Sequence, residues 1–198
     1  MKKLRIGITG GIGSGKSKFC EVAKSLGYKV LLADEISKDI LANDSDVKKE
    51  IIESFGASSF IDNAPNKKFL AEQVFSNPEQ LLKINSILHP PTLSRINKLM
   101  DEYLKTDNLV FVESALIYEI EIEEMFDYVV LVTATDENKI KRVSERSGLS
   151  AEEIKKRIDN QLTDDEKKGW ADFTLENNGT EQDFANKCGF IINLLKSL

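Results

Sequence analysis

Apolar and polar positions alternate with two different periods along this chain. Short apolar runs have the length of buried strands, and longer segments with apolar residues three and four positions apart have the spacing of amphipathic helices. The first run, around Ile6 and Ile8, is followed by helical spacing over residues 17–26. Strands that alternate with helices predict an α/β fold with a parallel sheet. Further strand-like runs cover residues 28–32, 109–112, 128–132 and 173–175.

The stretch from residue 44 to residue 107 has a different pattern, with helical spacing and no convincing strand. A helix is expected to begin with Asn77 as its N-cap and Pro78 in its first turn. The sequence His89-Pro90-Pro91 is expected to end this helix, and a further helix is expected over residues 93–104. A helical block between the strands of a parallel sheet is a common place for the recognition of a second substrate.

After the run at residues 128–132 the chain becomes basic and helical. Arg142 and Arg146 are four residues apart and share one helix face. Ser150 and Glu153 form a capping box that opens a second helix. The two helices meet at Gly148-Leu149-Ser150, which could act as a hinge. They could then close over a triphosphate as a lid, and arginine there would neutralise charge on the transferred phosphoryl group. Pairing of these cations with nearby surface acids is the alternative, and the residues alone favour it.

The strongest motif lies between the first strand-like run and the helix that follows. Residues 10–17, Gly-Gly-Ile-Gly-Ser-Gly-Lys-Ser, fit the pattern G-x-x-x-x-G-K-[ST] of a phosphate-binding loop. Glycines allow positive φ and leave backbone N–H groups free to surround a phosphate at the start of the helix. Lys16 adds a point charge at the outer phosphates, and the Ser17 hydroxyl can hold Mg²⁺. The motif predicts binding of a nucleoside triphosphate.

Composition argues against several classes of function. The chain has 27 Lys and Arg against 33 Asp and Glu, and its net charge of −6 argues against a nucleic-acid partner. No apolar run approaches the length of a membrane span, and no signal peptide is expected. The two cysteines, Cys20 and Cys188, have helix-like neighbours and are expected in the core rather than in a disulfide or a metal site. The expected setting is the cytoplasm.

Three polar residues each have two interpretations. Asp34 follows the run at residues 28–32, where a carboxylate can take a proton from an attacking hydroxyl, but it is equally suited to be a helix N-cap. His89 is the only histidine, and a buried structural role is favoured over a substrate contact. Glu113 follows another run, and it either acts near the metal through water or is a solvated strand end. Position alone does not decide between these two interpretations of Glu113.

Together these motifs resemble the dephospho-coenzyme A kinase family over nearly the whole chain. The loop at residues 9–17, Thr-Gly-Gly-Ile-Gly-Ser-Gly-Lys-Ser, is close to the family's own version. Ala33-Asp34 stands where the family has Asp-Ala-Asp, and Leu88-His89-Pro90 matches its Leu-His-Pro. Residues 113–119 resemble its Asp-x-Pro-Leu-Leu-Phe-Glu. The family's lid and C-terminal pattern is matched by Arg142, Arg146, Gly148-Leu149-Ser150, Arg157, Gln161, Ala171-Asp172 and Asn177-x-Gly179.

The resemblance implies the P-loop NTPase kinase fold, an α/β fold with a five-stranded parallel sheet, a helical substrate-binding insertion and a helical lid. The implied cofactors are ATP and Mg²⁺, and the implied small-molecule substrate is dephospho-CoA. Phosphorylation of its ribose 3′-hydroxyl would give coenzyme A, the last step of CoA biosynthesis. We expect no nucleic-acid or membrane partner, and a monomer or a weak homo-oligomer. The implied parts are a nucleotide-binding core (residues 1–43, 108–138 and 172–198), a helical CoA domain (44–107) and a lid (139–171).

The resemblance also implies roles for single residues. Asp34 would be the general base for the ribose hydroxyl, and Lys16 and Arg142 would stabilise the transferring phosphoryl group. Ser17 would bind Mg²⁺. The implied substrate contacts are Asp34, His89 and Leu116, and the implied nucleotide contacts are Gly11, Ile12, Gly13, Ser14, Gly15, Lys16, Ser17, Lys18, Arg142 and Arg146.

Four positions depart from the family pattern. Leu32 replaces the first Asp of Asp-Ala-Asp, and Lys18 stands where Thr usually follows the loop. These changes leave the base and the metal-binding serine in place. Glu113 replaces Asp and lengthens the side chain, so the role at this position is less certain, and Ala115 replaces Pro. None of the four removes a group that the chemistry clearly needs.

Three other functions remain as alternatives. A different small-molecule kinase of the same fold, such as a nucleoside monophosphate or shikimate kinase, is the first. A regulatory GTP-binding switch would carry Asn-Lys-x-Asp and Asp-x-x-Gly motifs, and this chain has neither. A nucleotide-binding module without activity is disfavoured because Lys16, Ser17 and Asp34 are all present.

Overall fold

The computed structural model of the protein describes residues 2–75 and 77–198. The chain forms two compact units. The first unit consists of Met1–Leu32 together with Met100–Leu198, and the second unit is Ala33–Leu99. The boundaries of the helical unit therefore differ from those of the expected CoA domain at residues 44–107. The functional division into core, CoA domain and lid stays a prediction.

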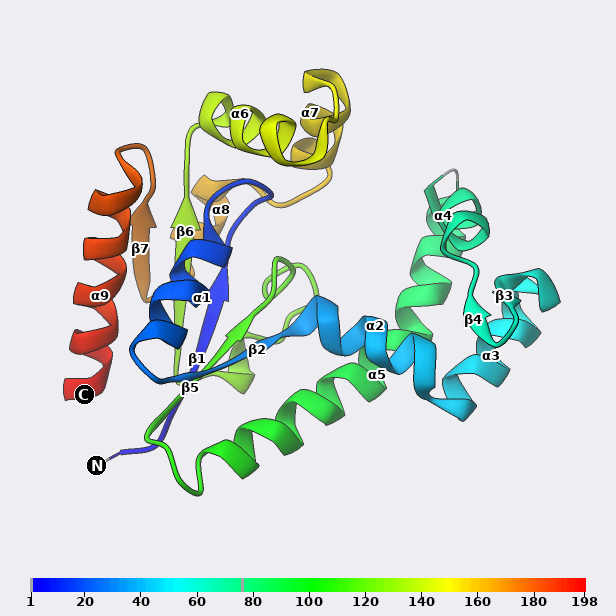
Figure 1. Cartoon of the computed structure of the whole chain (residues 1–198), viewed down its shortest axis with the longest axis horizontal. Coiled ribbons are helices and arrows are strands. Elements are labelled where there is room, and N and C mark those ends of the chain that lie inside the picture. The colour runs from blue at the N-terminus through cyan, green and yellow to red at the C-terminus, as the bar shows by residue number, and fades with distance from the viewer. Residues whose placement is uncertain (1, 76) are drawn as a thin grey trace. The chain divides into compact units, whose positions relative to one another are not determined.

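The first unit is built on a five-stranded parallel sheet with the strand order β2-β5-β1-β6-β7 (Figure 1). Each pair of neighbouring strands is parallel. The predicted five-stranded parallel sheet is thus confirmed. Its strands are β1 (Leu4–Thr9), β2 (Lys29–Leu32), β5 (Leu109–Glu113), β6 (Tyr128–Thr133) and β7 (Phe173–Glu176).

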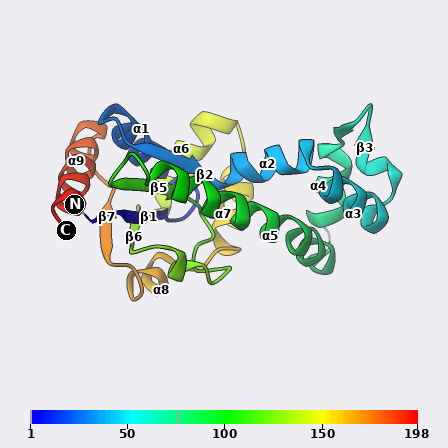
Figure 2. The same cartoon turned by 90° about the horizontal axis from the view of Figure 1, so that it is seen from below.

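Helices cover both faces of this sheet, which explains why its central strands are continuous apolar runs. Figure 2 shows α1 (Lys16–Ser25) and α9 (Glu181–Ser197) on one face and α8 (Asp164–Lys168) on the other. Phe19 of α1 and Phe111 of β5 meet edge to face with their ring centroids 5.9 Å apart. Cys20 and Cys188 are buried free thiols, so their predicted place in the core is confirmed.

The register of the strands brings the first phosphate-loop residues and one acidic side chain to the same edge of the sheet. Ile8 of β1 and Leu32 of β2 both pair with Glu113 of β5. The loop at residues 10–15 begins two residues after Ile8, at the carboxyl end of β1. Open parallel sheets bind their ligands at this edge.

Two helices follow β6, as predicted from the basic stretch after it. They are α6 (Asp136–Ser147) and α7 (Ala151–Asp159). Gly148 ends α6 with φ 68°, and the capping box of Ser150 and Glu153 opens α7. The short helix α8 was not predicted. Its signal was a second capping box, in which Thr163 and Glu166 cap each other's backbone N–H groups.

The second unit is mainly helical. An apolar cluster around Ile51, Leu70 and Ile84 forms its core. The unit contains α2 (Ala33–Asn43), α3 (Ser45–Phe55), η1 (Ala57–Ser59), α4 (Lys67–Phe75) and most of α5 (Pro78–Tyr103), whereas η2 (Glu123–Met125) belongs to the first unit.

The expectation that residues 44–107 contain no strand was wrong. β3 (Phe60–Ile61) and β4 (Ala64–Pro65) pair as an antiparallel hairpin. The two residues between them, Asp62 and Asn63, have φ values of 49° and 66°. The type I′ turn, a common two-residue hairpin turn, needs positive φ at both positions, and Asp and Asn tolerate it better than most residues. Strands of two residues are too short to produce a period-two pattern.

The expected helix break at His89 was also wrong, because α5 runs without interruption from Pro78 to Tyr103 and contains Pro90 and Pro91. Its start is as predicted, since the Asn77 side chain accepts a hydrogen bond from the Glu79 N–H. A proline inside a helix costs about 3 kcal/mol through a lost hydrogen bond and a clash. Here both halves of the helix bury apolar side chains, namely Ile84, Ile87 and Ile96. Burial of each contributes about 1.5–3 kcal/mol, so together these side chains offset the local cost.

Among the helices of the described residues, none is both long enough and apolar enough to cross a membrane.

The cap of α7 gives a stability prediction. Ser150→Ala removes the side chain that accepts from the Glu153 N–H and should destabilise α7 by about 1 kcal/mol. Backbone amides of α7 should then exchange with solvent about fivefold faster, which hydrogen-exchange mass spectrometry would measure. Ser45→Ala is the matched control, because Ser45 starts α3 but Asp44 is the cap of that helix. Equal exchange in α7 of both variants would contradict the prediction.

Candidate functional site

Three glycines give the phosphate loop its shape. Gly10, Gly13 and Gly15 have φ values of 142°, 75° and 114°. A Cβ at these positions would lie 2.1 Å from the Val132 carbonyl oxygen, 2.6 Å from the Lys139 carbonyl oxygen and 2.1 Å from Asn177 Nδ2, respectively. Both the backbone conformation and the packing therefore exclude a side chain at all three positions.

The loop leads directly into the N-terminus of α1. Gly15 is the N-cap residue of this helix, so no side chain covers the N–H groups of its first turn. Uncapped N–H groups at a helix N-terminus attract an anion through hydrogen bonds and through the helix dipole. Ser17, in that first turn, is exposed. The start of α1 thus has the geometry that suits an anion, and nucleotide contact by residues 11–17 stays a prediction.

Lys16 lies across the loop. Its Nζ donates to the carbonyl oxygens of Gly10 at 2.8 Å and of Gly11 at 3.2 Å. Glu113 Oε1 is 3.7 Å from the same Nζ, and both side chains are largely buried. Glu113 is therefore not simply a solvated strand end, which was one of its two interpretations.

Arg142 and Asn177 support the loop through its carbonyl oxygens. Arg142 Nη1 donates to Gly13 O at 3.3 Å and to Ser14 O at 3.4 Å, and Nη2 donates to Asn177 O at 2.7 Å. The buried Asn177 side chain donates from Nδ2 to Ser14 O at 2.8 Å. The contact of Arg142 with a phosphoryl group stays a prediction, since these hydrogen bonds hold the loop itself. The role of Asn177 was missed, although the Asn-x-Gly motif marked its position.

Two residues of the lid segment reach the loop from α6 and from the end of α7. Gln161 Oε1 accepts a hydrogen bond from the Ile12 N–H at 2.9 Å. Lys139 is buried, and its Nζ is 2.8 Å from Asp164 Oδ2. Sequence reasoning did not single out Lys139, because a lysine in a basic run carries no signal of burial.

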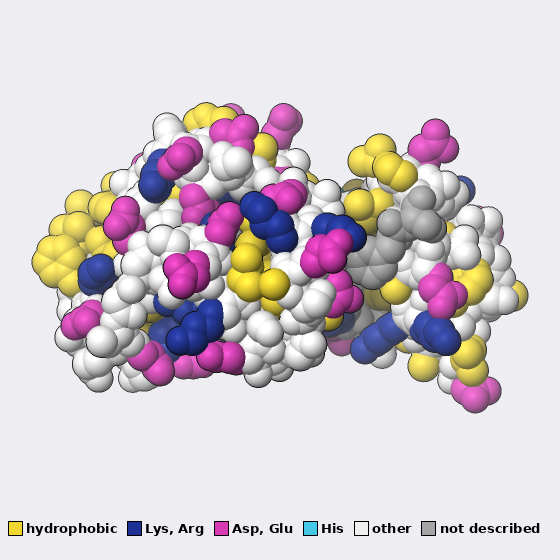
Figure 3. All heavy atoms as spheres, turned by 90° about the horizontal axis from the view of Figure 1, so that it is seen from above, with side chains coloured by type: hydrophobic (Ala, Val, Ile, Leu, Met, Phe, Trp, Pro, Cys, Tyr) yellow, Lys and Arg dark blue, Asp and Glu magenta, His cyan; other side chains and the backbone are white. Residues whose placement is uncertain are grey.

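The other basic residues predicted near the nucleotide have surface positions. Arg146 is exposed on α6. The Lys18 side chain forms ion pairs with Glu181 of α9 and with Glu21, and the Glu181 contact raises the pKa of Lys18. Figure 3 shows basic and acidic side chains intermixed on the face that carries α6 and α7. Surface pairing therefore accounts for part of this charge, for example between Lys155 and Asp136.

The loop after β5 belongs to the same unit. Leu116, a predicted substrate contact, is partly exposed, and its N–H donates to the Ser114 hydroxyl at 3.2 Å. Asp34 and His89 belong to the other compact unit. The structure thus brings Lys16, Ser17 and Leu116 into one unit, and it places the other two predicted substrate contacts in the second.

Asp34 is exposed in the first turn of α2, which begins at Ala33 directly after β2. Its interpretation as the N-cap is therefore wrong, because it lies inside the helix rather than before it. His89 lies within α5, and partial burial lowers its pKa below the ordinary value of histidine. The burial therefore favours the neutral imidazole.

The donor set suits Mg²⁺ bound together with a nucleotide. Within the described residues no group of three or more His, Cys, Asp or Glu side chains could hold a metal ion by itself. Mg²⁺ commonly binds through one or two protein oxygens, with water and substrate phosphates completing its coordination. The exposed Ser17 hydroxyl in the first turn of α1 fits this pattern. The residues present therefore fit the ion.

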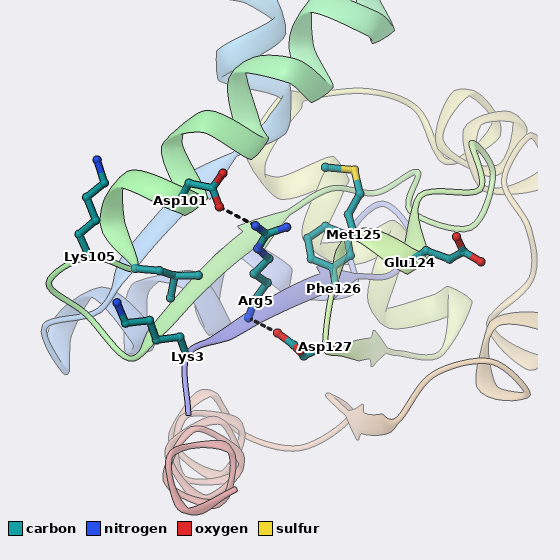
Figure 4. Close-up of a pocket in the computed structure, with 9 residues that line it drawn as sticks. Lys3, Arg5, Asp101, Lys105, Glu124, Met125, Phe126 and Asp127 are labelled. Carbon is teal, nitrogen blue, oxygen red and sulfur yellow. Dashed lines mark hydrogen bonds and ion pairs between the residues drawn. The ribbon is translucent and has the colours of Figure 1, made fainter. Parts of the chain in front are cut away.

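A cavity of about 470 Å³ lies elsewhere on the first unit (Figure 4). It is lined by Lys3 and Arg5 at the start of β1 and by Asp127 just before β6. Arg5 donates to Asp101 Oδ1 at 2.6 Å, and its N–H donates to Asp127 Oδ2 at 2.8 Å. The cavity is therefore at the amino ends of the strands, opposite the phosphate loop, and its Arg5 and Asp101 side chains form an ion pair with each other.

The helical unit has a cavity of about 350 Å³ between α2 and α5. Two exposed cations, Arg95 and Lys98, line it together with Asp39 and Asp44. Asp44 caps α3, and Asp39 accepts a hydrogen bond from the Asn43 side chain at 2.8 Å. Both acids are thus already engaged with hydrogen-bond donors of the helical unit.

A central parallel strand, a glycine loop at its carboxyl end and a following helix define a P-loop phosphotransferase. The family model for dephospho-CoA kinase matches residues 4–183. A dephospho-CoA kinase of Dehalococcoides mccartyi is 38% identical over 175 residues, 87% of this chain and 88% of that protein. The chain belongs to the dephospho-CoA kinase family.

Solved structures agree with this assignment. TT1252 from Thermus thermophilus superposes with a TM-score of 0.82 at 33% identity, and the match covers 98% of this chain and 99% of that chain. A dephospho-CoA kinase from Campylobacter jejuni superposes with a TM-score of 0.74 at 30% identity and covers 96% of both chains. The family resemblance and the kinase fold expected from the sequence are confirmed. The protein is a kinase, and the reaction of its family is the ATP-dependent last step of CoA biosynthesis.

The loop geometry gives a prediction about one glycine. Gly15→Ala should abolish measurable ATP binding, because the new methyl group would overlap Asn177 Nδ2 and displace the support of the loop. Isothermal titration with ATP would measure this. Gly27→Ala is the matched control, since Gly27 also has positive φ, at 90°, but has open space around it. It should lower stability by about 1–2 kcal/mol and leave ATP affinity unchanged. Unaltered ATP affinity in Gly15→Ala would contradict the prediction.

Proposed function

We propose that this protein transfers the γ-phosphoryl group of ATP to the ribose 3′-hydroxyl of dephospho-CoA. The O3′ oxygen forms a bond to the γ-phosphorus while the bond from that phosphorus to the β,γ-bridging oxygen breaks. The hydroxyl proton passes to a protein base, and ADP leaves with the electron pair. The observation that carries the proposal is the complete phosphate loop in a chain of this family.

On the nucleotide side, the proposal assigns the triphosphate to the loop and the first turn of α1. Backbone N–H groups of the loop surround the phosphates, apart from those of Ile12 and Ser14, which already donate to Gln161 and Gly11. Lys16 neutralises charge that develops on the transferring group. The hydrogen bonds of Lys16 to Gly10 and Gly11 support this role, because they hold its ammonium group over the loop. Arg142 contributes through the loop and, as predicted from the family, at the phosphoryl group.

Mg²⁺ is proposed as the metal cofactor, held by the Ser17 hydroxyl together with the nucleotide phosphates. When bound, it neutralises part of the triphosphate charge. Glu113 is proposed to act in the same region, where it faces Lys16 at 3.7 Å.

Asp34 is proposed as the general base. Its carboxylate is exposed in the first turn of α2, immediately after β2 in the chain. A carboxylate at this position can accept the proton of the ribose hydroxyl. The family motif Asp-Ala-Asp, retained here as Ala33-Asp34, supports the assignment.

The helical block at residues 44–107 is proposed to bind the acceptor, with His89 and Leu116 as substrate contacts. The cavity between α2 and α5 supports this, because Arg95 and Lys98 provide positive charge for the pyrophosphate of dephospho-CoA. The lid at residues 139–171, with Arg146, is proposed to close over the nucleotide. The proposed setting is the cytoplasm, and the proposed state is a monomer or a weak homo-oligomer.

Acceptor specificity tests the function as a whole. The purified protein with ATP and Mg²⁺ should convert dephospho-CoA to coenzyme A and should leave AMP, dTMP and shikimate unmodified. Chromatography with mass detection would measure each product in one competition assay. Transfer to a different acceptor would overturn the substrate assignment and keep the loop assignment. ATP binding without transfer to any of the four would indicate an inactive nucleotide-binding module.

Asp34→Asn tests the base. The amide cannot accept the proton, so kcat should fall about 10²–10⁴-fold, while the Kd for ATP should stay within about twofold of the original. Steady-state kinetics and isothermal titration would give the two quantities. Glu35→Gln is the matched control, because Glu35 is a neighbouring exposed acid that pairs only with Lys38 among the described residues. Near-normal turnover of Asp34→Asn would refute the assignment.

A further inference from the structure

A fully buried lysine of α8 forms an ion pair with a glutamate in the loop after β5. Lys167 of α8 has no exposed surface, and its Nζ is 2.6 Å from Glu119 Oε1 in the loop after β5. The same Nζ donates to the Ala115 carbonyl oxygen at 3.4 Å. A buried ion pair has a large desolvation cost, and removal of one partner leaves a charge without compensation. The pair therefore joins α8 firmly to the loop after β5.

The glutamate of this ion pair also contacts the segment that follows α7. Glu119 Oε1 also accepts a hydrogen bond from the Leu162 N–H at 3.3 Å. The preceding residue, Gln161, accepts the Ile12 N–H of the phosphate loop with its side-chain oxygen at 2.9 Å. We call Glu119, Gln161, Leu162 and Lys167 the clasp. It connects α8, the loop after β5 and the lid segment to the phosphate loop.

A second contact holds the same segment from the side of α6. Lys139 Nζ is 2.8 Å from Asp164 Oδ2 and 3.6 Å from Asp136 Oδ1. Lys139 also packs on the loop, since a Cβ added at Gly11 would be 3.5 Å from its Nζ and 3.5 Å from Gln161 Oε1. The segment from Gln161 to Asp164 is thus held by two contacts, one from Glu119 to the Leu162 N–H and one from Lys139 to Asp164.

We propose that Glu119 and Lys167 are positioning residues for nucleotide binding, which act through Leu162 and Gln161 on the phosphate loop. Gln161 can stay at the Ile12 N–H only while the next residue is held by Glu119, and Lys167 holds Glu119. A loop that keeps its shape before the ligand arrives loses less conformational entropy on binding. The inference rests on the proposed binding of ATP at this loop.

The first test removes the hydrogen bond between the Gln161 side chain and the Ile12 N–H. Gln161→Ala leaves the buried ion pair intact and should weaken ATP binding about 3–10-fold, the loss expected for one hydrogen bond. Its melting temperature should hardly change. Gln182→Ala, an exposed glutamine of α9 that bonds only to Asn186 among the described residues, is the control and should bind ATP normally. Binding is measured by isothermal titration without acceptor, so the result does not depend on which substrate is phosphorylated.

The second test removes the ion pair. Glu119→Leu with Lys167→Met replaces both buried charges by apolar groups, a change that proteins often tolerate. It should weaken ATP binding to a similar degree. Addition of Gln161→Ala should weaken binding no further than about twofold, because both changes break the same connection. Lys168→Met is the control, since Lys168 is partly exposed and pairs with Asp165 at the surface.

Two results would overturn the proposal. One is a folded Glu119→Leu/Lys167→Met variant with unchanged ATP affinity. The other is a triple variant whose loss of ATP affinity equals the product of the losses in Gln161→Ala and in Glu119→Leu/Lys167→Met. Trp170, the only tryptophan, packs on Tyr118 at 5.4 Å, so its emission reports whether the clasp region keeps its structure. If the apolar pair does not fold, Glu119→Gln in the same cycle removes the charge at nearly unchanged size. A failure to make coenzyme A with normal clasp results would overturn only the proposed function.

Discussion

The absence of space for a Cβ in the phosphate loop is the constraint on which the site depends. Gly10, Gly13 and Gly15 combine positive φ with backbone or side-chain atoms less than 3 Å from where a Cβ would be. Close packing is what allows carbonyl oxygens of β6 and α6 and the Asn177 amide to reach the loop backbone. The same packing leaves the N–H groups at the start of α1 as the side that a phosphate can approach.

Several polar side chains around the loop form hydrogen bonds with its backbone. Arg142 and Asn177 bind its carbonyl oxygens, and Gln161 binds one of its N–H groups. Preorganisation of this kind places dipoles before the charge of the ligand arrives, so less reorganisation is needed during binding. A buried lysine and glutamate, Lys167 and Glu119, extend this support beyond the loop. The phosphate loop is therefore one part of a larger network of hydrogen bonds and ion pairs, which extends to α8 and the loop after β5.

Three sequence interpretations were wrong, each for a different physical reason. Pro90 and Pro91 break isolated helices, yet α5 continues through them since apolar residues before and after are buried. The hairpin at Asp62 and Asn63 has strands too short for a periodic signal. The N-cap interpretation of Asp34 failed because α2 starts at Ala33, two residues earlier than a cap at Asp34 would place it.

The sequence by itself determined the five strands of the parallel sheet, the phosphate loop and the capping box at Ser150, because each is encoded by neighbouring residues. The period of apolar positions predicted the parallel sheet, and the spacing of glycines with Lys16 and Ser17 predicted the nucleotide site. Family motifs added the dephospho-CoA kinase family. Only the tertiary structure decided which polar residues meet. Lys139 with Asp164, Lys167 with Glu119 and Gln161 with Ile12 are distant in sequence, and sheet topology together with burial, not local pattern, brings them within bonding distance.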